Sequence, residues 1–186
     1  MVGVNIDYRL APKDSWPAAA KDLAAAIAWV RANIARYGGD PNRIILWGHS
    51  AGANHVTDYL AHPEVRGAEA KAVKGAVLLS AFYPATPGDG KPHAYYGSDQ
   101  QLQSLPNVIA GLERNKVPLF IANAEFDPEA FRLTGRSTRD TLCQSTSRCP
   151  SYVDLKDHNH YTEGMAVGTS DRSLTEPLLR WIERLR

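Results

Sequence analysis

The spacing of hydrophobic residues changes several times along the chain, and each change marks a predicted element. Residues 2–8 alternate apolar and other side chains with a period of two, which predicts a β-strand. After Trp16-Pro17, apolar residues recur at helical spacing as far as Ile34, and a proline suits the first turn of a helix because its missing N–H is not needed there. Residues 43–47 form a second strand-like run. A strand, a helix and a strand joined by short links predict a right-handed βαβ unit.

The same alternation continues to the C-terminus. Short apolar runs typical of buried parallel strands occupy residues 73–80, 117–122 and 151–155. Helices are predicted over residues 51–61 and 129–141, and a last helix over 174–185 has its apolar residues on one face and Thr175 as a candidate cap. With the two earlier strands, these runs predict a three-layer α/β sandwich of about five mainly parallel strands.

Residues 82–105 interrupt this alternation. Prolines and glycines recur throughout the segment and break any long helix. We expect this segment to form a lid or cap over a site at the carboxyl ends of the strands, where ligands of parallel α/β sheets collect. The 186 residues, of which 44% are hydrophobic, suffice for one domain with a sizeable core, so a single domain over 1–186 is expected.

A serine between two glycines directly follows the strand-like run at 43–47. The sequence there is Gly48-His49-Ser50-Ala51-Gly52. The pattern G-x-S-x-G between a strand and a helix is typical of a nucleophile elbow, in which the serine hydroxyl stands exposed above the sheet. Gly48 and Gly52 are expected to let the strand and the helix approach closely. The helix N-terminus would place partial positive charge beside a developing oxyanion.

A serine hydroxyl needs an imidazole to accept its proton and a carboxylate to orient that imidazole. Asp127 follows the strand predicted at 117–122, and His160 follows the strand at 151–155, so the order along the chain is Ser, Asp, His. Asp127 could instead be a plain helix N-cap, since Asp-Pro-Glu opens a helix well. Glu125 is the alternative acid.

His158 is the alternative base, because it lies two residues before His160 and only one of them can meet Ser50. We favour His160, which lies further from the strand, and expect His158 to be a turn residue. The two histidines could also bind a metal ion with Asp127 or Asp157, but no further ligand cluster supports this, and no metal or other cofactor is expected. The remaining histidines are predicted to flank the nucleophile or to lie in surface loops: His49, His55, His62 and His93.

Charge and composition narrow the range of partners. The formal net charge is +1, from 21 basic and 20 acidic residues, so neither nucleic acid nor an anionic membrane is indicated and a small neutral substrate fits better. No apolar run approaches the ~20 residues that span a bilayer, and no signal peptide is recognisable, so a cytoplasmic location is the default expectation. Cys143 and Cys149 could pair or stay reduced.

Several stretches resemble an α/β-hydrolase of the carboxylesterase type, similar to hormone-sensitive-lipase-like and feruloyl-esterase- or arylformamidase-like members. Besides the elbow, they are Asp7-Tyr8-Arg9-Leu10-Ala11-Pro12, Tyr37-Gly38-Gly39-Asp40-Pro41-Asn42-Arg43-Ile44, Asn123-Ala124-Glu125-Phe126-Asp127-Pro128 and Asp157-His158-Asn159-His160.

The resemblance implies a serine esterase acting on small carboxylic esters through an acyl-enzyme. Ser50 would be the nucleophile, Asp127 the acid and His160 the base, and the backbone N–H of Ala51 would donate to the oxyanion. An aryl amide or formamide hydrolase with the same triad is one alternative. A catalytically inactive domain that acts by binding is another.

Such enzymes carry further strands and a His-Gly-Gly-Gly oxyanion loop upstream of the point where this chain begins. We therefore expect a fragment or a misplaced start. In the family an upstream strand separates the strand at 2–8 from the elbow strand. Without it, either these two strands pair directly, or an apolar sheet edge stays open to self-association.

Overall fold

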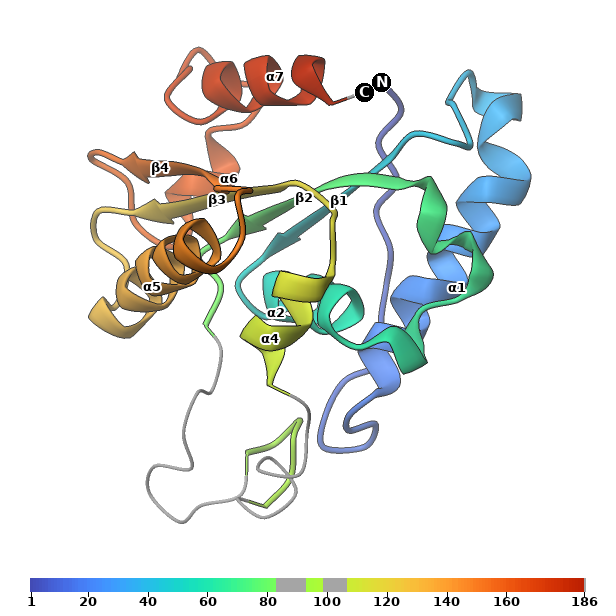
Figure 1. Cartoon of the computed structure of the whole chain (residues 1–186). Coiled ribbons are helices and arrows are strands. Elements are labelled where there is room, and N and C mark those ends of the chain that lie inside the picture. Colours follow the sequence, from blue (N-terminus) through green and yellow to red (C-terminus); the bar gives the residue numbers. More distant parts are fainter. Residues whose placement is uncertain (83–92, 99–106, 186) are drawn as a thin grey trace.

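The computed structural model describes residues 1–82, 93–98 and 107–185. Its centre is a parallel sheet of four strands in the order β1-β2-β3-β4 (Figure 1). The strands are β1 (Ile44–His49), β2 (Val73–Leu79), β3 (Leu119–Ala124) and β4 (Ser151–Leu155). All four coincide with apolar runs in the sequence. Because every pairing is parallel, the carboxyl ends of the strands share one edge of the sheet.

Helices connect the strands and cover the sheet on both faces. They are α1 (Ala18–Asn33), α2 (Ala51–Ala61), α4 (Val108–Arg114), α5 (Glu129–Ser145), α6 (Thr162–Met165) and α7 (Thr175–Arg184), with short 3-10 turns at η1 (Ile34–Tyr37), η2 (Pro63–Val65) and η3 (Ala68–Ala72). Residues of α1, α2, α4 and α5 pack into one core cluster with one face of the sheet. Helix α7 covers the opposite face (Figure 1). The predicted three-layer α/β architecture is therefore confirmed.

The α7 face of the sheet has its own hydrophobic core. Phe120 of β3 lies 5.6 Å from Trp181 of α7, measured between ring centroids, and both side chains are buried. Leu178 and Leu174 complete the contact on the helix side. The apolar stripe of the last helix thus packs as its spacing predicted. Thr175, however, is the first residue of α7, Leu174 occupies the N-cap, and no side chain caps the helix, so the expected cap is wrong.

The strand predicted over residues 2–8 is absent, and the sheet has four strands where about five were expected. Within the described residues nothing pairs with the outer side of β1, and residues 2–8 make no strand pairing. Instead Arg9 ties this segment to α1, with Nη2 donating to Asp22 Oδ1 at 2.7 Å. Of the two arrangements considered above, the displaced segment with an open sheet edge is the one observed.

The segment predicted to be a lid is described only in part, since residues 83–92 and 99–106 lie outside the described residues. Residues 93–98 form a small turn closed by an antiparallel bridge between His93 and Gly97. Tyr95 and Tyr96 in this turn are buried and pack with Ala19. This part of the segment therefore lies against the N-terminal end of α1.

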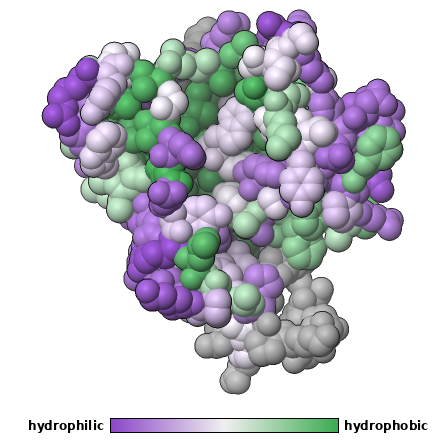
Figure 2. Space-filling model, turned by 180° about the vertical axis from the view of Figure 1, so that it is seen from behind, coloured by the Kyte–Doolittle hydropathy of each residue, from purple (hydrophilic) through white to green (hydrophobic). Residues whose placement is uncertain are grey.

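Three further observations complete the fold. Cys143 of α5 and Cys149 are joined by a disulfide bond, which closes the connection between α5 and β4. Among the described helices none is both long and apolar enough to cross a membrane. Seen from behind, the molecule exposes hydrophobic side chains in its upper half between hydrophilic ones (Figure 2).

Candidate active site

Ser50 lies between the end of β1 and the start of α2, at the carboxyl edge of the sheet. Its backbone has φ 54° and ψ −122°, a conformation that L-residues rarely adopt and that marks local strain. The Ser50 N–H donates to the carbonyl of Leu79 at 2.9 Å, so the end of β2 holds the turn in place. The Ser50 hydroxyl makes no hydrogen bond within the described part of the chain.

The two glycines beside Ser50 have different surroundings. A Cβ at Gly48 would lie 2.4 Å from the carbonyl oxygen of Gly52 and 2.5 Å from backbone atoms of Ala53, so only glycine fits where β1 meets the first turn of α2. A Cβ at Gly52 would meet nothing within 4 Å. The close approach expected at both positions is thus found only at Gly48. Ala51 is the first residue of α2, directly after the serine.

Asp127 and His160 are brought together at the same edge. His160 Nδ1 donates to Asp127 Oδ1 at 2.9 Å, and the Asp127 side chain is fully buried while that of His160 is 20% exposed. Because Nδ1 carries the proton of this hydrogen bond, Nε2 is the ring nitrogen free to accept a proton. This is the orientation that a general base needs.

Two further donors hold the second oxygen of Asp127. The backbone N–H of Ala124, at the end of β3, donates to Oδ2 at 2.8 Å. The hydroxyl of Ser80, directly after β2, donates to the same oxygen. Ser80 itself is fully buried and has a positive φ of 45°. The sequence interpretation missed this residue, although its position just past a buried strand could have pointed to it.

The alternative acid and base lie elsewhere. Glu125 accepts a hydrogen bond from the backbone N–H of Asp157 at 3.0 Å, which ties the two loops together. The His158 ring lies 3.0 Å from Ser173 Oγ through Nε2 and 3.2 Å from Thr162 Oγ1 through Nδ1, and it is 7% exposed. His158 thus braces the loop that follows β4, and its ring has no contact with Asp127 among the described residues.

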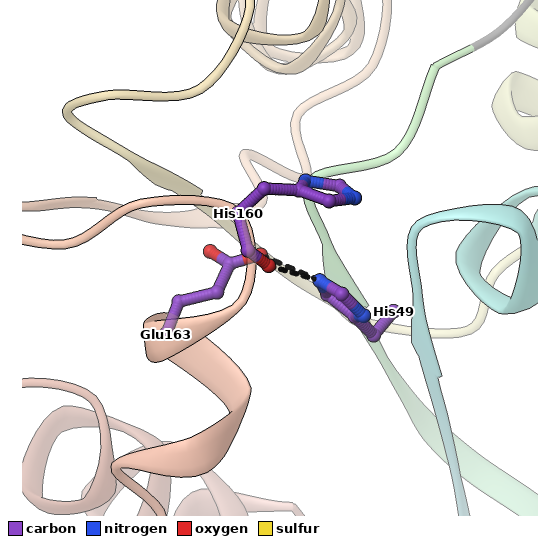
Figure 3. Close-up of side chains that lie close together, drawn as sticks. All are labelled: His49, His160 and Glu163. Carbon is purple, nitrogen blue, oxygen red and sulfur yellow. Dashed lines mark hydrogen bonds and ion pairs between the residues drawn. The ribbon is translucent and has the colours of Figure 1, made fainter.

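Beside His160 lies a second polar group that the sequence interpretation did not foresee. His49 Nε2 is 2.7 Å from the carbonyl oxygen of His160 and 3.3 Å from Glu163 Oε1, and the rings of His49 and His160 are 4.6 Å apart (Figure 3). The loop after β4 therefore reaches across the carboxyl edge to the end of β1. The Glu163 carboxylate beside it raises the pKa of His49, and the His160 carbonyl adds to this effect, while burial opposes it.

The same three side chains are a potential metal-ligand group. Their ligand atoms lie within 4.8 Å of one another. This is not the combination considered from the sequence, because His158 turns toward Ser173 instead. His160 Nδ1 is already bonded to Asp127 and His49 Nε2 to a carbonyl, so the observed geometry is that of a hydrogen-bonded cluster.

The His160 ring also has aromatic neighbours. Phe131 of α5 lies 5.2 Å from it between centroids, and Phe131 in turn stacks on Phe82 at 5.2 Å. The backbone of Phe82 is held on both sides by Asn54 of α2, whose Oδ1 accepts from the Phe82 N–H at 3.0 Å and whose side-chain amide donates to the Phe82 carbonyl. Phe82 and Phe131 thus form an apolar surface next to His160.

Comparisons with known proteins find esterases that are similar to this chain. Esterase LipQ of Mycobacterium tuberculosis is 28% identical over 176 residues, which are 84% of this chain and 42% of LipQ. Carboxylesterase NlhH of the same species is 53% identical over 51 residues, or 27% of this chain and 16% of NlhH. The solved structure of a hyperthermophilic esterase from Pyrobaculum calidifontis superposes with a TM-score of 0.68 at 22% identity, covering 96% of this chain and 62% of that one.

The chain thus spans less than half of LipQ and less than two thirds of the solved esterase. A family model described as the α/β-hydrolase fold matches residues 1–144, well over half of the sequence. This chain belongs to the α/β-hydrolase family.

Proposed function

We propose that this chain carries the catalytic triad of a serine hydrolase for small carboxylic esters, with Ser50 as nucleophile, His160 as base and Asp127 as orienting acid. The observation that carries the proposal is the 2.9 Å contact between His160 Nδ1 and the buried Asp127, made at the same sheet edge as the strained Ser50. The esterase names of relatives such as LipQ and NlhH support the ester as substrate class.

The proposed reaction follows from the contact between His160 Nδ1 and Asp127, which leaves Nε2 to act on Ser50. Ser50 Oγ attacks the ester carbonyl while His160 Nε2 accepts the hydroxyl proton, and Asp127 stabilises the imidazolium that forms. The backbone N–H of Ala51, at the start of α2, faces the oxyanion of the tetrahedral intermediate. His160 then passes its proton to the departing alcohol. Water, activated by the same imidazole, hydrolyses the acyl-enzyme and releases the acid.

A fluorophosphonate probe tests the nucleophile directly, since it labels only an activated serine. We expect the 186-residue chain to be labelled and Ser50→Ala to be unlabelled. A matched control is Ser137→Ala, which removes an exposed hydroxyl on α5 that bonds only the Thr134 carbonyl. Equal labelling of wild type and Ser50→Ala would refute the proposal and favour a domain that acts by binding.

The choice of base is tested by a pair of variants. His160→Gln removes the ring that contacts Asp127, whereas His158→Gln removes a ring that contacts Thr162 and Ser173. We expect the labelling rate to fall by at least about 10²-fold in His160→Gln and much less in His158→Gln, because general base catalysis typically contributes 10²–10⁴-fold. A larger loss in His158→Gln would exchange the two roles.

A further inference from the structure

Glu163 is a buried carboxylate with one charged neighbour. Its side chain is 0% exposed, and neither oxygen has a hydrogen-bond partner in the described part of the chain. An uncompensated carboxylate in such a place is costly, so a positive charge has to lie beside it or it has to bind a proton. Within the described residues its ion-pair partner is His49, whose Nε2 lies 3.3 Å from Oε1.

His49 also contacts the backbone of the proposed base. A carbonyl oxygen can only accept, so the 2.7 Å contact between His49 Nε2 and the His160 carbonyl requires that His49 carries its proton on Nε2. The same N–H faces Glu163, and Figure 3 shows both oxygen atoms converging on it. The His49 side chain thus joins the end of β1 to the residue from which the His160 ring projects.

We propose that the ion pair of His49 and Glu163 is a positioning device for the triad, which clamps the main chain of His160 so that its ring stays hydrogen-bonded to Asp127. The inference rests on the proposed function, because it assigns His160 the role of base. His49 and Glu163 are positioning residues and do not touch the reacting atoms. Their position, on β1 next to Ser50 and on α6 next to His160, ties the nucleophile strand to the base loop.

The clamp depends on pH through the charge of His49. The titratable groups that face His49 are Glu163 on α6, the His160 ring beside it, and Asp127 after β3, whose charge also acts on His49. Glu163 holds the pKa of His49 above its usual value. The ion pair is therefore intact below the pKa of His49 in the folded protein and weakens as the pH rises through it. Labelling that depends on the clamp should therefore fall on the alkaline side, as His49 loses its proton.

The first experiment measures coupling between the two residues. Fluorophosphonate labelling rates are compared for wild type, His49→Gln, Glu163→Gln and the double variant. Each single variant should lose roughly 10-fold to 100-fold, since a small misplacement of a catalytic group can cost that much. The labelling rate of the double variant should fall no further than that of the more impaired single variant, because either substitution alone already removes the ion pair. Losses that multiply would show that the two side chains act independently and would overturn the proposal.

The second experiment does not depend on activity. The imidazole signals of the six histidines are followed by NMR over pH, and His49 is assigned by its loss in His49→Gln. We expect the His49 pKa to fall in Glu163→Gln and to stay raised in Glu163→Asp, which keeps the charge. Titration of His49 that is identical in wild type and Glu163→Gln would refute the ion pair. If instead Ser50→Ala labels as well as wild type, the proposed function fails while the titration result still stands.

The pH dependence of the labelling rate distinguishes the clamp from a purely structural role of the His49–Glu163 pair. If the pair only stabilised the fold, Glu163→Gln would lower the labelling rate equally at all pH values at which the protein is folded. The clamp predicts that the alkaline limb of the wild-type profile is lost in His49→Gln. Circular dichroism of each variant confirms that the measured chain is folded, and an unchanged alkaline limb in folded His49→Gln would contradict the clamp.

Discussion

Asp58 is a carboxyl group buried on α2, and its 2% exposure makes it unusual among acidic residues. The hydroxyl of Tyr96 donates to its Oδ2 at 2.8 Å, which connects α2 to the described turn at residues 93–98. Burial raises the pKa of Asp58 to about 7, although the Tyr96 hydrogen bond opposes this rise. The group therefore changes its charge near neutral pH, inside the protein.

The free energy of unfolding should change with pH as Asp58 loses its proton. An acid with a raised pKa binds its proton more tightly in the folded state, so its contribution to stability is complete below the ordinary value of 3.8 and is lost as the pH rises toward about 7. Asp58→Asn cannot ionise but keeps an oxygen acceptor for Tyr96. Between about pH 5 and pH 8, we expect the free energy of unfolding of wild type to fall by on the order of 2 kcal/mol relative to Asp58→Asn.

Urea denaturation at the two pH values measures this difference. The control is Asp140→Asn on α5, whose wild-type side chain is 51% exposed and pairs with Arg139, so its removal should leave the pH dependence unchanged. The same pH dependence in wild type and Asp58→Asn would mean that burial does not shift this carboxyl.

At the scale of elements, the junction of β1 and α2 decides how Ser50 is presented. Gly48→Ala would place a methyl group 2.4 Å from the Gly52 carbonyl, and backbone of a helix cannot move away cheaply. We expect a loss of about 2 kcal/mol or more in stability, as in other overpacked sites, together with loss of probe labelling. Chemical denaturation and labelling of the same sample measure both effects.

The matched variant is Gly52→Ala, at the second residue of α2, where the added methyl group meets nothing within 4 Å. Alanine favours a helix by up to about 1 kcal/mol over glycine, so this variant should be as stable as wild type or more so. Equal damage from both substitutions would show that the two glycines share one steric role, as the symmetric sequence pattern had predicted.

Strands that pair with a neighbour were predictable, and the one without a neighbour was not. The apolar runs at β2 and β3 are buried on both faces, which leaves a clear pattern in the sequence. Residues 2–8 carry an equally good alternating pattern. Alternation, however, describes only the side chains. It does not say which neighbouring strand will pair with the backbone N–H and C=O groups of these residues. The sheet partner of a segment is a tertiary property.

In the candidate site, too, some features could be predicted from the sequence and others could not. Ser50, Asp127 and His160 could be proposed because each lies a few residues past the end of a predicted strand, and parallel strands end at one edge. The contacts between His49 and Glu163 and between Ser80 and Asp127 join residues far apart in sequence. Nothing in their local pattern names the partner, so these contacts required the folded structure.

At the scale of the whole molecule, the described sheet has two edges without a paired strand, the outer sides of β1 and β4, and the edge at β1 carries an exposed aromatic side chain. The core under α7 includes residues of β2, β3 and β4 but from β1 only Ile45, which is partly buried. Trp47, two residues further on and on the same face, is 43% exposed. A strand edge without a neighbour, next to an exposed tryptophan, is a template for pairing with another chain.

We expect the 186-residue chain to self-associate with rising concentration through β1. Trp47→Lys should shift the protein toward the monomer, because a charge beside an exposed edge disfavours strand pairing and apolar contact. The control is Trp29→Lys, where the wild-type tryptophan is 48% exposed but belongs to helix α1 instead of a strand, and it should leave association unchanged. Sedimentation velocity over a range of concentrations, with circular dichroism to verify folding, distinguishes the variants. A wild type that stays monomeric throughout, or an equal effect of both lysines, would show that the edge of β1 does not drive association.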